Sequence, residues 1–258
     1  MKKNILTENI KNQLAFFLAL LGVYALSAFL TYAFFSEQLA EMVGMPLPEL
    51  GVPTTLIGLA NAAIVLVVYG ILGFFGIWFA RKLGLPGIYR EDGNWKSWFW
   101  VPLIIGLVCG VILVIGDLIF AEINDFGRFP HPGFPASILA SISAGIGEEI
   151  AFRGFFFGLW AIILNWFLKR KNNRKLALWI ANILAALAFG AGHLGSLMIL
   201  TGASTITEIN PFLLFEIFLL NGIVGIAAGE RYIKEGLVAA SGVHFWTDVV
   251  FHVVWGIM

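Results

Sequence analysis

Residues 98–120 read WFWVPLIIGLVCGVILVIGDLIF, an apolar run in which Asp117 is the single charged residue. A helix needs about 20 apolar residues to cross the roughly 30 Å hydrocarbon core of a bilayer, and this run is long enough. The whole chain has the same character, because 59% of its 258 residues are hydrophobic and 12% are charged. Soluble domains contain about 45–50% apolar and about 25% charged residues. The sequence therefore predicts an integral membrane protein.

Six further apolar runs of similar length accompany this one. We predict an all-α fold, a polytopic transmembrane helical bundle with about seven spans. The expected spans lie near residues 14–35, 57–80, 98–120, 136–167, 176–200, 211–229 and 237–257. The first run is too long for the core of a signal peptide, so we expect a true span. The fourth run either continues across the membrane or is broken or partly re-entrant, and the sixth is short.

The basic residues predict the orientation of the bundle. Fourteen of the 16 Lys and Arg residues fall within residues 2–11, 81–96, 169–175 and 231–234, which lie in alternate loops. The intervening loops contain only Arg128. Because basic residues stay on the cytoplasmic side, we predict a multi-pass protein of the cytoplasmic (plasma) membrane with its N-terminus inside. The 16 acidic residues balance the 16 basic ones, so net charge does not indicate a nucleic-acid partner.

Ionisable residues within the predicted spans are candidates for function. A charge at the centre of a bilayer costs about 2.5–3.5 kcal/mol on insertion scales, so such side chains normally face a protein interior. The candidates are Asp117, Glu148, Glu149, Arg153, His193, Glu216, His244, Asp248 and His252.

The segment GEEIAFRG, residues 147–154, concentrates three of these charges. Residues four apart share one face of a helix, so Glu149 and Arg153 are expected to form an ion pair. Glu148 is rotated by about 100° from Glu149 and lacks that partner. In one interpretation all three residues form a buried network that locks helices together. In the other, Glu149 and Arg153 hold the helix and Glu148 is free to act as a general base.

Two later segments carry histidines. FGAGHLGS, residues 189–196, contains His193, which by itself is as consistent with an interhelical hydrogen bond as with a functional role. GLVAASGVHFWTDVVFH, residues 236–252, places His244, Asp248 and His252 at successive steps of four along one helix face. His252 lies close to the outer end of its span, where an interfacial histidine needs no role, so we leave it out of the predicted site.

Together the three segments resemble a known family. EEIAFR, FGAGH and HFWTD follow the order of the EExxxR, FxxxH and HxxxN/D motifs of the CPBP family, also called Abi. Its members are CAAX proteases and bacteriocin-processing enzymes, which are polytopic intramembrane endopeptidases. The resemblance covers about residues 136–252. It implies a catalytic helical core at residues 136–258. The N-terminal transmembrane helices and loops of residues 1–135 belong to the same structural domain.

The resemblance also implies a site and an activity. Glu148, His193, His244 and Asp248 would line a cavity within the membrane, with Glu149, Arg153 and Phe189 in support. Glu148 and a histidine would activate a water that attacks a peptide bond of a peptide or membrane-protein substrate within the lipid bilayer. The other polar groups would stabilise the oxyanion or protonate the leaving amine. The family suggests that the cavity opens toward the cytoplasm.

Asp248 departs from the family pattern, because CAAX-processing members generally have asparagine there. An ionised aspartate cannot donate a hydrogen bond to an oxyanion. Asp248 is therefore protonated, or it orients His244, or it helps to bind a metal. Glu148, His193, His244 and Asp248 form a plausible zinc set, although HExxH is absent. We favour water activation without a metal cofactor over the zinc alternative.

The expected depths of the two histidines differ. At about 1.5 Å per residue, His193 lies about 26 Å from the cytoplasmic end of its helix and His244 about 10 Å from the end of its own. Helix tilt, a late start of the fifth span, or a break at Gly190 or Gly192 would bring them together.

Two other functions use the same residues. In a transporter or channel, Glu148, His193, His244 and Asp248 would relay protons or bind an ion. The absence of an inverted repeat in the sequence disfavours this hypothesis. A non-catalytic scaffold, such as a bacteriocin-immunity protein, is the third hypothesis, and the intact set of acids and histidines disfavours it.

Overall fold

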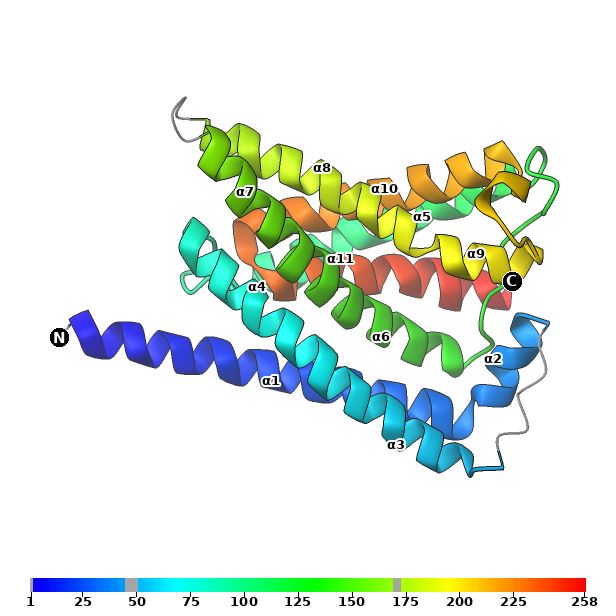
Figure 1. Cartoon of the computed structure of the whole chain (residues 1–258), viewed down its shortest axis with the longest axis horizontal. Coiled ribbons are helices and arrows are strands. Elements are labelled where there is room, and N and C mark those ends of the chain that lie inside the picture. Colours follow the sequence, from blue (N-terminus) through cyan, green and yellow to red (C-terminus); the bar gives the residue numbers. More distant parts are fainter. Residues whose placement is uncertain (1, 45–50, 169–172) are drawn as a thin grey trace.

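The computed structural model describes residues 2–44, 51–168 and 173–258, and these residues form helices joined by short loops (Figure 1). The α-helices are α1 (Lys2–Phe34), α2 (Ser36–Met42), α3 (Thr54–Ile64), α4 (Gly70–Leu83), α5 (Val101–Phe120), α6 (Ala136–Glu149), α7 (Gly158–Leu168), α8 (Arg174–Gly192), α9 (Leu194–Thr201), α10 (Pro211–Glu235) and α11 (Leu237–Asp248). The π-helical segments are η1 (Val65–Tyr69), η2 (Lys96–Trp100), η3 (Ile150–Phe157) and η6 (Val249–Val254), and the 3₁₀ turns are η5 (Ile206–Glu208) and η7 (Trp255–Ile257).

Seven helical stretches of the described chain are long and apolar enough to cross a membrane, which confirms the predicted fold class. They are Asn9–Phe34, Thr54–Leu83, Lys96–Phe120, Ala136–Leu168, Arg174–Thr201, Pro211–Glu235 and Leu237–Ile257. The fourth stretch runs without a break through α6, η3 and α7, so the alternative of a broken helix is wrong. The sixth continues to Glu235, six residues beyond its predicted end at 229, because the charged turn at 230–235 stays helical.

The helices run side by side along the long axis of the molecule, with α11 near the centre (Figure 1). Helix α11 packs against α5, α6 and α10, while α1 packs against α3 and α6. Large apolar side chains such as Leu18, Phe74 and Ile104 are more than half exposed, as expected of a surface that faces lipid. The loop after α4 and the turn between α10 and α11 lie at one end of the bundle, whereas α2, α9 and the C-terminus lie at the other.

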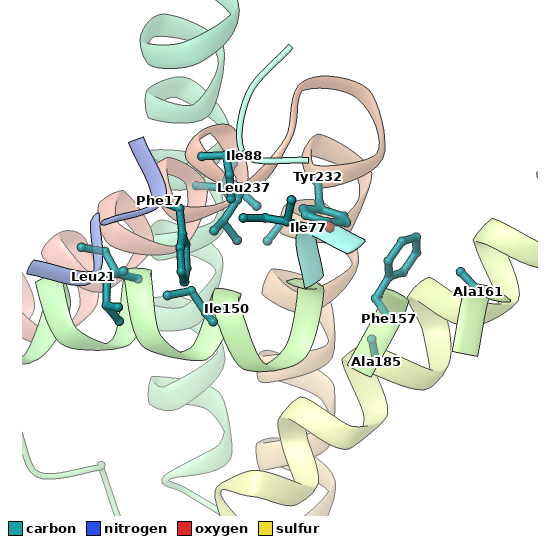
Figure 2. Close-up of a cluster of buried hydrophobic side chains, with 14 of the residues drawn as sticks. Phe17, Leu21, Ile77, Ile88, Ile150, Phe157, Ala161, Ala185, Tyr232 and Leu237 are labelled. Carbon is teal, nitrogen blue, oxygen red and sulfur yellow. The ribbon is translucent and has the colours of Figure 1, made fainter. Parts of the chain in front are cut away.

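A buried apolar cluster holds η3 against its neighbours (Figure 2). Ile150 and Phe157 of η3 are 0% exposed, and they pack in one cluster with Phe17 of α1, Ile77 of α4 and Tyr232 of α10. The segment between Ile150 and Phe157, which includes Arg153, is therefore fixed at both ends by the core.

Helix α4 approaches η3 through two glycines. A Cβ atom added at Gly76 would lie 3.0 Å from backbone atoms of Gly154. Backbones come this close in membrane helices only at small residues. We expect Gly76→Val to destabilise the protein by about 1–3 kcal/mol, the usual cost of overpacking. Gly22→Val is the matched control, because a Cβ atom at Gly22 meets nothing within 4 Å. Thermal unfolding in detergent measures both, and equal melting temperatures would contradict the prediction.

Candidate active site in the membrane-spanning helices

A cavity of about 260 Å³ lies between α6, α8, α10 and α11. Its lining includes all four residues predicted to be catalytic, Glu148, His193, His244 and Asp248. Glu148 comes from the last turn of α6, His193 from the residue that follows α8, and the other two from α11. The three sequence motifs thus converge on one cavity although they come from three separate spans.

Glu149 is fully buried and contacts two other residues of the motifs. Its Oε1 atom lies 3.0 Å from Nη1 of Arg153, so the expected ion pair is present. The same oxygen accepts a hydrogen bond of 2.9 Å from Nδ1 of His244, which the sequence did not predict. Asp248, which we considered as the group that orients His244, lies 3.6 Å from Nε2, beyond the usual hydrogen-bond range. Glu149 therefore holds the imidazole as well as the guanidinium.

The second nitrogen of His244 faces two carboxyl groups. Nε2 lies 3.6 Å from Oδ2 of Asp248 and 3.9 Å from Oε2 of Glu148. Because an ionised carboxylate only accepts hydrogen bonds, Nδ1 carries the proton that it donates to Glu149. A bare lone pair on Nε2 would be repelled by two ionised carboxylates. A proton shared between Nε2 and these carboxyl oxygens would relieve that repulsion, which makes this group a candidate proton donor inside the cavity.

His193 lies at the break between α8, which ends at Gly192, and α9, which begins at Leu194. A break here is one of the three ways in which we expected the two histidines to reach the same depth. Nδ1 of His193 lies 2.9 Å from the carbonyl oxygen of Phe189. A carbonyl oxygen only accepts, so Nδ1 bears the proton and Nε2 of the neutral ring bears the lone pair. His193 thus has a basic nitrogen that this bond does not use.

Phe189 connects the two histidines and the arginine. The centroid of its ring lies 4.9 Å from that of His193 and 5.3 Å from that of His244. The guanidinium of Arg153 lies over the ring, 4.7 Å from the centroid. Such a cation–π contact contributes about 2 kcal/mol where the cation is desolvated. One buried aromatic ring therefore packs against side chains from all three motifs.

A histidine that we did not predict, His131 in the loop between α5 and α6, contacts a residue of the cavity lining. Nδ1 of His131 lies 3.0 Å from Nδ1 of His252, which lines the cavity. Our omission of His252 rested on its position near the end of its span, and the structure places it in the lining. One nitrogen must donate and the other accept, so the pair requires at least one neutral ring. Burial lowers the pKa of His131 despite the nearby Asp117 carboxylate, which favours that state.

Buried polar residues fix the same loop. Nδ2 of Asn124 donates a 2.8 Å hydrogen bond to Glu216 in α10. The backbone N–H of Phe129 donates a 3.0 Å hydrogen bond to Asp117 in α5. Asp117, Asn124 and Glu216 are at most 1% exposed. The two intramembrane carboxyl groups, for which the sequence indicated no partner, therefore hold the loop whose residues Phe129 and Pro130 line the cavity.

The zinc alternative requires Glu148, His193, His244 and Asp248 to converge on one ion. Within the part of the chain that the structure describes, no group of three or more His, Cys, Asp or Glu side chains is arranged to hold a metal. No chemical step below uses a metal.

A comparison with protein families agrees with the resemblance that the three motifs indicate. The family model described as type II CAAX prenyl endopeptidase Rce1-like matches residues 130–250, which include every motif residue of the cavity. No curated protein and no solved structure matches the chain.

Proposed function

We propose that this chain acts as the type II CAAX prenyl endopeptidases of the Rce1-like family do, since the model of that family matches residues 130–250, and that Glu148 and His193 activate the water for hydrolysis of a peptide bond within the membrane. The convergence of the three motifs on one cavity carries the proposal. We assign the catalytic core to residues 136–258. Residues of 1–135 complete the cavity, because Met42, Leu113 and Phe129 also line it.

Glu148 is suited to be the general base. Its side chain is 33% exposed and lines the cavity, whereas its Oε2 atom is buried without a hydrogen-bond partner among the described residues. A carboxylate that is partly exposed in a cavity can accept the proton of a water as that water attacks the carbonyl carbon of the substrate. The lone pair on Nε2 of His193 supplies a second acceptor that positions the water.

The group formed by His244 and Asp248 is suited to the later steps. The attack converts the substrate carbonyl into an oxyanion, which a donor at Nε2 of His244 or at a protonated Asp248 would stabilise. Breaking the C–N bond requires a proton on the leaving amine, and Glu148 returns the proton taken from water. The products are then a carboxylic acid and an amine. Glu149 and Arg153 touch no reacting atom in this scheme and position His244.

The role of Asp248 can be tested with two substitutions. If Asp248 works as a hydrogen-bond donor, Asp248→Asn is expected to keep peptidase activity within about tenfold, because its amide also donates. Asp248→Leu is expected to lower kcat by about 10²–10³-fold, as loss of an oxyanion donor does elsewhere. Steady-state kinetics on folded variants gives both values. Equal losses in the two variants would show that the carboxylate charge matters instead.

Metal removal provides a separate prediction. Because we favour water activation by Glu148 and a histidine without a metal, we expect hydrolysis to be unchanged after treatment with a zinc chelator. Elemental analysis of the purified protein is the companion measurement. Stoichiometric zinc, together with activity that a chelator removes and zinc restores, would contradict metal-independent water activation.

The proposed activity itself is tested on protein purified in detergent. A panel of peptides is incubated with wild type, with His193→Ala and with the control Ser204→Ala, and products are identified by mass spectrometry. Ser204 is exposed on the loop after α9, away from the motif residues. Cleavage by wild type and the control but not by His193→Ala supports a peptidase. A wild-type protein that cleaves no peptide, but conducts ions across vesicle membranes, would favour the transporter.

The basic residues support the orientation of the protein in the membrane. Arg81, Lys82 and Arg90 lie in or near the loop after α4, and Arg231 and Lys234 lie in the last turns of α10. This end of the bundle also carries Arg174, whose Nη2 atom donates to the carbonyl oxygen of Leu83. Since Lys and Arg are retained in the cytoplasm, we propose that this end, with the N-terminus, lies inside and that the C-terminus lies outside a plasma membrane.

A further inference from the structure

The cavity extends from the catalytic residues toward one end of the bundle. Its lining includes Met42 at the end of α2, Pro130 in the loop between α5 and α6, and Leu200 in the last turn of α9. Helices α2 and α9 lie at the same end as the C-terminus (Figure 1). Four of the five lining residues of α10, from Glu216 to Asn221, belong to the half of that helix nearest to this end, and the fifth, Val224, lies next to its midpoint.

This end of the bundle is poor in basic residues. Arg128 is the one Lys or Arg among the described connecting residues found there, at 35–44, 51–53, 121–135 and 202–210. Its guanidinium lies over the ring of Trp255, 5.1 Å from the centroid. Of the other 12 basic residues in the described part of the chain, 11 lie at the opposite end, and the last is Arg153. By the rule that retains Lys and Arg in the cytoplasm, the end toward which the cavity extends is extracytoplasmic.

The opposite side of the catalytic residues is closed by packing. Ile150, Ala240 and Val243 are 0% exposed and belong to the apolar cluster that fills the basic half of the bundle. The loop after α4 seals the start of α11, where the N–H groups of Leu237 and Val238 donate hydrogen bonds of 2.9 Å to backbone carbonyls of that loop. A peptide arriving from the basic end would have to displace this core to reach Glu148.

We infer that the catalytic cavity opens on the extracytoplasmic face of the membrane, so that the substrates are exported peptides or the outer ends of membrane-anchored segments. The class of substrate that we infer rests on the proposed protease function. The side of the membrane on which the cavity opens is inferred from geometry and charge alone. It reverses the cytoplasmic opening that the family resemblance suggests.

Cysteine labelling tests the side of the opening. The native Cys109 is buried and is replaced by alanine to give a cysteine-free background. Asn221→Cys then reports on the cavity lining, Ser204→Cys on the loop after α9, and Glu91→Cys on the loop after α4. With a membrane-impermeant maleimide on intact cells, we expect labelling at 221 and 204, and labelling at 91 only after permeabilisation. Labelling at 221 that requires access from the cytoplasm would overturn the inference.

A membrane-anchored reporter protein tests on which side of the membrane substrates are cleaved. A single-span membrane protein carries the same pool of randomised peptide segments just beyond either its outer or its inner end, and it is co-expressed with wild type or with Glu148→Gln. We expect cleavage of the outer segments by wild type only. Cleavage confined to the inner segments would overturn the inference. Cleavage of neither, with the expected labelling pattern, would count against the proposed protease and leave the outward opening established.

Discussion

Replacement of Glu148 with glutamine is expected to lower kcat/KM for peptide hydrolysis by about 10²–10⁴-fold, the usual contribution of a general base. Glutamine has the same shape but cannot take up the proton of the attacking water. The substitution breaks no hydrogen bond at the buried Oε2 atom of Glu148, which has no partner among the described residues. The melting temperature is therefore expected to stay close to that of wild type, and the loss would be one of chemistry rather than of folding.

Two further variants show whether the expected loss of activity is specific to Glu148. Glu41→Gln is the matched control, since Glu41 is an exposed acid on α2 and its replacement is expected to leave kinetics unchanged. Glu149→Gln is expected to lower both stability and activity, because Glu149 binds Arg153 and His244. If Glu148→Gln hydrolysed peptides normally while Glu149→Gln were folded and inactive, the roles of the adjacent glutamates would be the reverse of those proposed.

The sequence predicted contacts that depend on a single helix. Glu149 and Arg153 are four residues apart, so helical periodicity alone brings them onto one face. Their 3.0 Å ion pair forms even though the backbone widens into the π-helical segment η3 directly after Glu149. The number of spans could be predicted for a similar reason, because an apolar run of sufficient length crosses a bilayer whatever its neighbours are.

Contacts between helices could not be predicted in the same way. The bond from His244 to Glu149 joins residues 95 positions apart and depends on how α11 packs against α6. Counting residues along each helix placed His193 and His244 at different depths in the membrane. In the structure both histidines pack against the ring of Phe189. His131 could not be placed because it lies in a loop, where neither helical nor strand periodicity gives a direction to the side chain.

Removal of the charge at Arg153 is expected to give the largest loss of stability. Both Arg153 and Glu149 are 0% exposed, so Arg153→Met leaves a carboxylate in the core with one of its two partners missing. Breaking a buried pair from one side costs about 3–5 kcal/mol. Lys234→Met is the matched control, because Lys234 also pairs with a glutamate four residues away but is 59% exposed. Exposed pairs contribute about 0–1 kcal/mol. Thermal unfolding in detergent compares the two.

The double variant Glu149→Gln, Arg153→Met separates the two tasks of Glu149. With both charges removed, the buried site no longer holds an unpaired carboxylate, so we expect stability to recover by about 1–3 kcal/mol relative to Arg153→Met alone. Activity is not expected to recover, because an amide at 149 can turn either its oxygen or its NH₂ group toward Nδ1 and no longer fixes the tautomer and orientation of His244 as a carboxylate does. Recovery of both properties would show that the 2.9 Å bond to His244 is dispensable. Recovery of neither would show that the ion pair is not what Arg153 contributes to folding, and would leave its stacking on Phe189 as the dominant interaction.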